Sequence, residues 1–588
     1  MLSILFLLSV WLNGMLILRL IKQSHHTLPF SFIIGSLVTV TPIFLVTSYI
    51  TRNLSLTMML YALGMLPLYG LCVYRRFYLN SLWRVDEFVV FICMVVFGLY
   101  MFTKGFSYDA TTHTFLISSN TYMDFGAHIP LIRSFSMGNN FPTTLPFFAT
   151  SGGTYYFLTD FFAGVLEFLG IRIDFAINSI STLAFASVGT ALYSMTYGIW
   201  KSKMLGVLAI LIFFSSNSFE WLQYIKDHSN PVTWFGSIYH MSNYSPVVEV
   251  FWNLNTYLNQ RQLLFGIAAF CWFLYRRMQE KKYVTSVEQV LDGILLGCLS
   301  YWHMHVFLAS SLLFFLTGTR SMLSLGLSVL IALPQLYSIF GHSTTHIALS
   351  PGFIVTPVTI SYWVLFWIKN TGILIPLSCV GMVLAGKRYR MVSIFTFILF
   401  VIPNIFHISV RNVFDDHKFF LIWKVCMTLF AIFALFSLRK RAWIYLVVFV
   451  LIVSGCINFF VLKNDVNARI ADYVYHPLLQ KLSSSMSSQE VVITNGEIYD
   501  PANISGLKTL TGRAQYSYVY GGTPDPALKL QSDVLSGTGP DLRNRGISYV
   551  VCYSDSSVPN LKQCAADALT KRYTLVYTDG LGSVWKIK

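Results

Sequence analysis

Long apolar runs dominate the chain and recur from Met1 to about residue 463. Each run continues for about 17–25 residues, the length that a helix needs to cross the hydrocarbon core of a bilayer. Barrel strands would alternate polar and apolar positions over about ten residues, and these runs do not alternate. The pattern predicts an all-α polytopic membrane protein with about 12–15 transmembrane helices. The predicted spans lie near residues 1–21, 29–50, 55–74, 87–103, 173–200, 204–219, 262–275, 287–301, 306–319, 322–340, 360–385, 391–409, 419–437 and 442–463.

Polar stretches divide this pattern into four predicted parts. Residues 1–104 hold the N-terminal transmembrane helices, and residues 105–172 form the first long outer loop with juxtamembrane helices. Residues 173–463 form the transmembrane core. Residues 464–588 are polar and rich in Gly, Ser, Asp and Lys. We therefore expect a small soluble α/β domain at the C-terminus, on the lumenal or extracytoplasmic side.

The C-terminal part carries strand and turn signals of its own. Short apolar runs are typical of buried strands, and an Asp-Gly pair between two such runs predicts a hairpin. The predicted elements are strands at Val491–Thr494 and Ile547–Cys552, a hairpin of Thr574–Tyr577 and Ser583–Ile587 around Asp579-Gly580, and helices near 525–535 and 560–570. We find no Gly-rich phosphate loop and no nucleophile motif in this part of the sequence.

Composition agrees with a membrane protein. Hydrophobic residues make up 55% of the chain and charged residues 11%, and the mean hydropathy is +0.60. Soluble domains carry about a quarter charged residues. The net charge is +15, but Lys and Arg cluster in short loops between apolar runs, as the positive-inside bias predicts. We therefore expect no nucleic-acid partner. The clusters are Arg75, Arg76 and Arg84; Arg276, Arg277, Lys281 and Lys282; Lys387, Arg388 and Arg390; and Arg439, Lys440 and Arg441.

These basic clusters predict an orientation. If they face the cytoplasm, the first long loop and the C-terminal part lie on the outer side. Residues 155–171 must then be a re-entrant or surface-lying helix, and Asp160 and Glu167 in this segment favour that choice. The sequons at Asn53, Asn243 and Asn503 fall on the outer side as candidate N-glycosylation sites. The chain would lie in the endoplasmic reticulum of a eukaryote or the plasma membrane of a prokaryote.

Nine cysteines are present, and seven of them sit inside apolar runs. Buried free cysteine behaves as a small hydrophobic residue, so these seven are expected to pack in the core. The other two, Cys552 and Cys564, lie in the polar C-terminal part. A disulfide between them and two free thiols are both compatible with the sequence. No Cys/His spacing typical of a zinc site occurs.

The first outer loop holds the strongest candidate for catalysis. Asp124 and His128 would share one face of a helix, although Pro130 favours a helix that begins after Asp124. Ionisable groups near bilayer depth are costly unless paired or hydrated, so they often mark a working site. Asp124 is therefore either a catalytic base or the N-cap of the helix that follows.

Two further polar segments interrupt the apolar pattern. One is rich in amide and aromatic side chains, which suit sugar hydroxyls; the alternative is a polar helix entry at the membrane interface. This segment contains Asn253, Asn255, Gln260 and Arg261. In the other, His303 and His305 are two positions apart, so they need a strand or a helix break to face the same side. A hydrogen bond to a lipid phosphate or an internal partner is favoured there over metal ligation.

A last polar segment joins the predicted spans that end near 409 and begin near 419. It contains Arg411, Asp415, Asp416 and Lys418. The cations there are suited to a phosphate, and the adjacent carboxylates to a divalent ion that bridges to it. An ordinary charged turn is the alternative.

These features together resemble the GT-C superfamily of integral-membrane glycosyltransferases, which use polyprenyl-phosphate or polyprenyl-diphosphate sugars. Asp124 with His128 looks like the loop aspartate of that family and its neighbours. Asp415-Asp416-His417-Lys418 is similar to late polar loops of some members, and Thr511-Gly512-Arg513 with Ile547–Cys552 is similar to the tail domain of bacterial relatives. The chain departs from many members in having three or four crossings ahead of the candidate loop. It also lacks a Trp-Trp-Asp type motif, which disfavours a peptide-directed oligosaccharyltransferase.

The resemblance implies a hexosyltransferase, similar to mannosyltransferases, that uses a polyprenyl-phosphate sugar such as a dolichol-linked one. The acceptor would be a hydroxyl of a glycan, lipid or protein on the outer face. Asp124 would be the base of an inverting displacement, with His128 beside it. The residues implied in donor binding are Arg261, His303, His305, Arg411, Asp416 and Lys418, and those implied in acceptor or sugar binding are Asn253, Asn255 and Gln260. No cofactor is certain; a divalent cation on Asp415 and Asp416 stays open.

A transporter or lipid scramblase is the leading alternative, with the polar segments lining a translocation path. Many transporters show internal repeats, and we find none by inspection of the sequence. Most ionisable residues here also lie at the ends of the predicted spans instead of mid-span. A catalytically inactive scaffold with the same architecture is a third interpretation.

Overall fold

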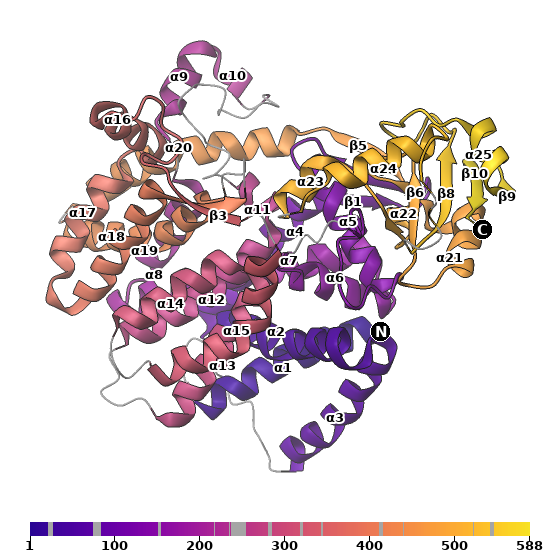
Figure 1. Cartoon of the computed structure of the whole chain (residues 1–588). Helices are drawn as coiled ribbons and strands as arrows, with labels where there is room; N and C mark the ends of the chain where they lie inside the picture. Colours follow the sequence, from indigo (N-terminus) through magenta and orange to yellow (C-terminus); the bar gives the residue numbers. More distant parts are fainter. Residues whose placement is uncertain are drawn as a thin grey trace.

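The computed structural model describes residues 1–21, 27–74, 84–150, 155–216, 218–234, 236, 254–279, 285–317, 322–342, 345–410, 415–438, 440–520, 522–540, 542 and 546–587. The apolar runs form helices that pack along most of the molecule, and the C-terminal part forms a sheet flanked by short helices (Figure 1). The chain is therefore mostly helical with a smaller α/β domain at its C-terminal end, as the sequence predicts.

The long apolar helices begin and end close to the predicted spans. They are α1 (Leu2–Leu20), α2 (Leu28–Val46, continued by a π-turn at Thr47–Thr51), α3 (Leu54–Tyr74), α4 (Val85–Gly105), α7 (Ile173–Trp200), α8 (Lys203–Ser215), α12 (Arg261–Met278), α13 (Ser286–Trp302), α14 (Met304–Leu316), α15 (Met322–His342), α16 (Ile360–Thr371), α17 (Leu374–Ala385), α18 (Arg390–Ile405), α19 (His417–Ser437) and α20 (Arg441–Asn464). Eight of the described helices are long and apolar enough to cross a membrane, or up to ten if each of two bent pairs is one span.

Fewer helices meet this length criterion than the about 12–15 crossings predicted, because some apolar runs form short or bent helices. α8 and α14 have 13 residues each, which is about 20 Å of helix against a bilayer core of roughly 30 Å. The predicted span 360–385 is split at Gly372, where φ is 58°. Its halves, α16 and α17, are bent by 88°. Apolar length alone does not reveal such breaks.

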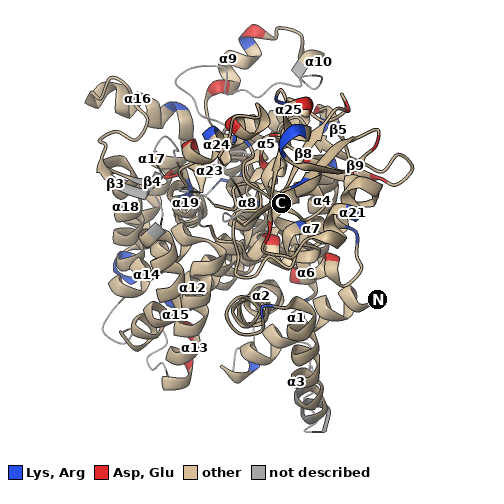
Figure 2. Cartoon of the chain, turned by 45° about the vertical axis from the view of Figure 1, so that its right-hand side comes forward, with Lys and Arg blue, Asp and Glu red and all other residues tan. Residues whose placement is uncertain are grey.

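The helical part presents apolar side chains on its outside. The apolar windows of α7 and α19 are 83% and 89% buried, whereas that of α1 is 28% buried. Leu5 and Leu8 on α1 and Val96 and Leu99 on α4 are among the exposed large side chains. Charged residues are sparse along these helices (Figure 2). An apolar exterior of this extent requires lipid around it, so the chain is a multi-pass integral membrane protein.

The segment predicted as re-entrant or surface-lying forms α6 (Leu158–Phe168). Its 11 residues span about 16 Å, too short for a crossing. It does not lie on a surface, because every side chain from Leu158 to Leu166 is buried. α6 packs against α5 (Tyr122–Ser136), α7 and α2. The acidic residues of the segment are therefore interior groups, which corrects the expectation of a surface helix.

The remaining elements form the outer loop and the C-terminal domain. The strands are β1 (Phe106–Asp109), β2 (Thr114–Ser118), β3 (Thr345–Leu349), β4 (Phe406–Val410), β5 (Asn467–Ala471), β6 (Val491–Thr494), β7 (Lys508–Thr509), β8 (Ile547–Tyr553), β9 (Thr574–Thr578) and β10 (Gly582–Lys586). The short helices are α9 (Glu220–Asp227), α10 (Pro231–Trp234), α11 (Asn255–Asn259), α21 (Pro477–Ser485), α22 (Pro501–Ile504), α23 (Ala514–Val519), α24 (Asp525–Leu535) and α25 (Ala566–Arg572).

One sheet joins the first outer loop to the C-terminal region, and a second sheet forms the C-terminal domain. β5, which follows the last long helix, pairs antiparallel with β2 of the first outer loop, so the order of this sheet is β1-β2-β5. The C-terminal domain has a five-stranded mixed sheet of order β7-β6-β8-β10-β9. β9 and β10 form the antiparallel hairpin that the sequence predicts. A third sheet pairs β3 with β4.

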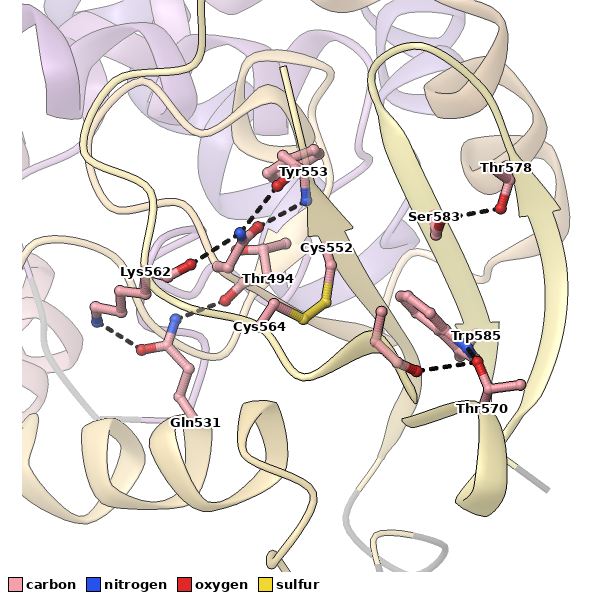
Figure 3. Close-up of a disulfide and its surroundings, with 12 residues drawn as sticks. Thr494, Gln531, Cys552, Tyr553, Lys562, Cys564, Thr570, Thr578, Ser583 and Trp585 are labelled. Atoms are coloured by element: carbon pink, nitrogen blue, oxygen red, sulfur yellow. Dashed lines mark hydrogen bonds between the residues drawn. A yellow bond between two sulfur atoms is a disulfide. The ribbon is translucent and has the colours of Figure 1, made fainter. Parts of the chain in front are cut away.

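A disulfide joins Cys552 on β8 to Cys564, with 6.1 Å between the Cα atoms (Figure 3). The segment that follows β8 is held near this bridge by polar contacts. Lys562 Nζ donates a hydrogen bond to Gln531 Oε1 at 2.6 Å, and the Lys562 carbonyl accepts one from Asn495. The bridge thus fastens this segment to the sheet.

The candidate glycosylation site Asn503 is contradicted by the structure. Asn503 is 2% exposed, and its amide nitrogen donates to the carbonyls of Pro146 and Leu507. A glycan needs an exposed amide nitrogen, so this sequon is structural. Asn53 is exposed and accepts a hydrogen bond from the backbone of Leu56 at the start of α3; it stays a prediction. Asn243 lies outside the described residues.

A buried ion cluster joins α5, α6 and the segment after β5. Arg133 of α5 lies 2.9 Å from Glu167 of α6 and 3.1 Å from Asp472. The three side chains are 4%, 7% and 3% exposed. Ser136 donates a further hydrogen bond to Glu167. The cluster therefore fixes α5 relative to both the helical core and the C-terminal region.

Replacing Arg133 by Leu should destabilise the protein by about 3–5 kcal/mol, because two buried carboxylates lose their counter-ion. Thermal unfolding of the purified protein in detergent measures this. The matched control is Arg469→Leu on β5, whose partner Asp109 is 3.9 Å away and whose side chain is 66% exposed; we expect no measurable change there. Equal losses in the two variants would contradict the importance of the cluster.

Candidate active site

Asp124 lies in the first turn of α5. The sequence suggested that Pro130 would delay this helix until after Asp124, or that Asp124 would be its N-cap. The structure corrects both points: α5 begins at Tyr122, includes Pro130, and has Thr121 as its N-cap. Asp124 as a residue is partly exposed, although protein surrounds most of its carboxylate, and no described residue forms a hydrogen bond with it. It is therefore available to an incoming group.

The start of α19 lies next to this carboxylate. Lys418 and Asp415 are close enough to Asp124 for their charges to act on it. The ammonium group of Lys418 is 3% exposed, lies 2.9 Å from Asp415 Oδ2, and donates to the Tyr156 hydroxyl at 2.9 Å. Segments almost 300 positions apart in the chain thus meet around Asp124.

His128 lies one helical turn after Asp124, as the sequence predicts. Its Nδ1 is 2.8 Å from Asp160 Oδ1 on α6, and both side chains are buried. Burial lowers the pKa of His128, but the carboxylates of Asp160 and Asp124 outweigh it and raise the pKa overall. Burial raises the pKa of Asp124, and the charges of His128 and Lys418 offset this only in part. A protonated His128 therefore favours the ionised form of Asp124.

His303 and His305 lie at the break between α13 and α14. His303 lies between α13 and α14 in an extended conformation, with φ −163° and ψ 106°, as the break predicted for this pair requires. Its ring centroid is 4.9 Å from that of Tyr156, and that of His305 is 5.0 Å from Phe419. His303 Nε2 and His305 Nδ1 have no hydrogen-bond partner among the described residues. Both are within electrostatic range of Lys418.

Arg261 does not have the donor-binding position that the sequence suggested. Its side chain is 1% exposed and donates to Asn178 Oδ1 at 2.6 Å and to the carbonyl of Leu258 at 3.2 Å. Its guanidinium lies 4.9 Å and 4.8 Å from the ring centres of Phe102 and Phe125. These contacts hold the guanidinium inside the fold, against the ring of Phe125 on α5.

The amide-rich segment is divided by a break between α11 and α12. Asn255 begins α11 and is buried, and Asn253 lies outside the described residues. At the break, Gln260 Nε2 donates to His417 Nε2 at 3.3 Å, and Gln262 Nε2 donates to the Tyr155 hydroxyl at 2.7 Å. Gln260 therefore adjoins the start of α19.

The adjacent carboxylates just before α19 have different partners. Asp415 pairs with Lys418, whereas Asp416 lies 2.5 Å from His407 Nδ1. Burial raises the pKa of Asp415, but Lys418 and the neighbouring histidines outweigh it and lower the pKa to about 2. Arg411 lies outside the described residues. Within the described part of the chain, no group of three or more His, Cys, Asp or Glu residues is arranged to hold a metal ion.

The C-terminal domain reaches the first turn of α5. The hydroxyl of Tyr516 on α23 donates to the carbonyl of Met123, and that of Tyr499 donates to the carbonyl of Tyr122. Figure 1 shows α23 beside α5. Gly126 permits this approach, because a Cβ there would lie 2.3 Å from the Tyr516 hydroxyl oxygen. The domain therefore supports the backbone that carries Asp124.

Sequence reasoning missed several residues of the site. Asp160 was noted only as a charge in an apolar segment, although such a charge is itself a signal of an internal partner. Tyr156 and Tyr516 carry no local signal, because their partners Lys418 and Met123 are distant in the chain. These contacts are visible only in three dimensions.

No family model and no curated protein matches the sequence. Among solved structures, the chain is similar to the archaeal oligosaccharyltransferase AglB from Archaeoglobus fulgidus, in complex with an inhibitory peptide and a dolichol-phosphate. The TM-score is 0.41 and the identity 11%, over 79% of this chain and 69% of that chain. A likeness of this size leaves the chemistry of the site to the residues of this chain.

Gly126→Ala should destabilise the protein by about 1–3 kcal/mol, because the added methyl group overlaps Tyr516 and Ile498. Thermal unfolding in detergent measures the loss. Gly64→Ala on α3 is the control, since nothing lies within 4 Å of a Cβ there. An unchanged unfolding temperature for Gly126→Ala would mean that the C-terminal domain does not pack closely against α5.

Proposed function

We propose that this protein is an integral-membrane glycosyltransferase of the GT-C type. It would move a hexose from a polyprenyl-phosphate donor to an acceptor hydroxyl on the outer or lumenal face. The observation that carries the proposal is the placement of Asp124. Asp124 is a partly exposed residue whose carboxylate has no hydrogen-bond partner among the described residues, and it lies within electrostatic range of the buried cation Lys418. A base for the acceptor hydroxyl and a cation for the leaving phosphate thus lie close enough to act on one substrate pair.

The proposed reaction is a single displacement. The Asp124 carboxylate takes the proton of the acceptor hydroxyl as its oxygen attacks the anomeric carbon. The bond from that carbon to the phosphate oxygen breaks, and the electron pair leaves with the lipid phosphate. Lys418 stabilises the charge that develops on this phosphate, and His303 and His305 supply ring nitrogens beside it. Attack opposite to the leaving group inverts the anomeric configuration.

Two neighbours adjust the proposed base. His128, held by Asp160, places positive charge near Asp124 and counteracts the effect of burial on its pKa. Asp415 neutralises Lys418 in part. Because Lys418 is paired with Asp415, it does not form an ion pair with Asp124. The net positive charge at Lys418 is therefore small until the donor phosphate binds. Asn255 and Gln260 are candidates for contacts with the sugar or acceptor.

Asp124→Asn should lower sugar transfer by about 10²–10⁴-fold, the usual contribution of a general base. Purified full-length protein is assayed with a polyprenyl-phosphate hexose and a hydroxyl acceptor. Asp109→Asn at the end of β1 in the same loop is the control and should keep wild-type transfer. Full transfer by Asp124→Asn would remove Asp124 from the reaction. Lipid or solute flux across sealed vesicles without any transfer by the wild type would favour a transporter or scramblase.

Transfer should fall on acidification, with a midpoint above the pKa of an ordinary aspartate. Burial raises the pKa of Asp124, and a general base is active only when ionised, so activity is present above this raised pKa and lost below it. His128→Asn removes a positive neighbour and should move the midpoint to still higher pH. The pH profile of kcat/KM measures both effects, with His113→Asn in the exposed hairpin as control. A downward shift for His128→Asn would contradict this electrostatic account.

A further inference from the structure

A cavity lies at the end of the helical core remote from Asp124. It has a volume of about 290 Å³ and is formed where α7 and α12 end and where the turn before α18 begins. This is near the lower limit of small-molecule sites, which are roughly 300–1,000 Å³. Its lining residues are Met195, Gly198, Ile199, Lys201, Tyr275, Met278, Gln279, Arg388 and Tyr389. It shares no residue with the site around Asp124.

α12 runs from the candidate active site to this cavity, so its length gives the distance between them. It begins at Arg261, which touches Phe125 beside Asp124, and it ends at Met278 in the cavity wall. Its 18 residues extend about 27 Å, close to the roughly 30 Å of a bilayer core. α7 is long and apolar enough to cross a membrane and ends beside Lys201 of the cavity wall, so we place the cavity about one hydrocarbon thickness from Asp124, at the opposite membrane face.

The charge of the cavity favours an anion. Lys201 and Arg388 come from different elements, and no acidic residue lines the cavity among the described residues. The carbonyl ends of α7 and α12 each bring roughly half a negative charge, and the amide end of α18 brings about half a positive one. The two full positive charges of Lys201 and Arg388 exceed the net negative charge of these helix ends. A cationic ligand is correspondingly disfavoured.

The remaining lining suits a molecule that lies partly in the membrane. Met195, Ile199 and Met278 form an apolar wall, and Tyr275 and Tyr389 combine apolar rings with hydroxyl groups. Tyrosine is enriched at membrane interfaces for this reason. Basic pockets between transmembrane helices on the cytoplasmic side bind anionic lipid head groups. An inorganic ion would make no use of the apolar wall.

We propose that this cavity binds the phosphate head group of an anionic phospholipid, with Lys201 and Arg388 as its charge partners. The acyl chains extend along the apolar wall toward the bilayer. The inference is independent of sugar transfer, because it concerns the opposite membrane face and other residues. Through this site, the content of anionic lipid in that leaflet would change the stability of the protein.

The test titrates short-chain phosphatidylglycerol into the full-length protein in a neutral detergent, with thermal unfolding as the readout. Ligands that bind the folded state raise the unfolding temperature. Lys201→Gln with Arg388→Gln should weaken binding about 25-fold, since each basic group near an anionic lipid contributes roughly a fivefold factor. Lys203→Gln with Arg390→Gln is the matched control, because these exposed cations lie nearby but outside the lining. It should bind like the wild type.

Two ligand controls identify the source of the phosphate. Short-chain phosphatidylcholine should stabilise less than phosphatidylglycerol, and inorganic phosphate at the same concentration should have little effect. Equal weakening in both double variants would overturn the site, as would equal stabilisation by phosphatidylcholine. Equal stabilisation by inorganic phosphate would overturn the lipid assignment. If the lining double variant fails to fold, Arg388→Glu replaces it, with the same expected loss of phosphatidylglycerol binding.

Discussion

The guanidinium of Arg133 is the contact on which the rest of the arrangement depends. It is buried between Glu167 of α6 and Asp472 after β5, so three segments from different parts of the chain converge on one cation. A buried cation with two carboxylates tolerates little displacement, since removing any partner leaves an uncompensated charge. This fixes α5 in position and direction, and the direction of α5 determines where Asp124 points.

The site is organised by the same electrostatic logic. Two buried cations of the site have an acidic partner: His128 has Asp160, and Lys418 has Asp415. Asp124 differs from these carboxylates, because it receives charge from two sides and has no hydrogen bond among the described residues. The tail domain stabilises this placement from outside through the backbone carbonyls of the first turn of α5. In the proposed reaction, the unpaired carboxylate is the one that acts.

The sequence predicts the elements far better than their contacts. The apolar run at 173–200 coincides with α7, and the helix near 525–535 coincides with α24, because length and composition are local signals. Pro130 was misleading, since α5 continues through it. Arg261 illustrates a different difficulty. A cation at the start of a span can bind either a ligand or a partner inside the protein, and the sequence does not show that Arg261 contacts Asn178. Pairings such as Arg133 with Asp472 have no local signature.

The proposed mechanism requires that Asp124 and Lys418 face one site from one side of the membrane. The most direct measurement is chemical cross-linking of Asp124→Cys with Lys418→Cys, in a chain whose membrane cysteines are replaced and whose tail disulfide is kept. A short bifunctional maleimide is added to membranes, and the linked peptides are identified by mass spectrometry. The account predicts a cross-link between the two positions and none in either single variant. Absence of a cross-link, with the two cysteines labelled from opposite sides of the membrane, would contradict it.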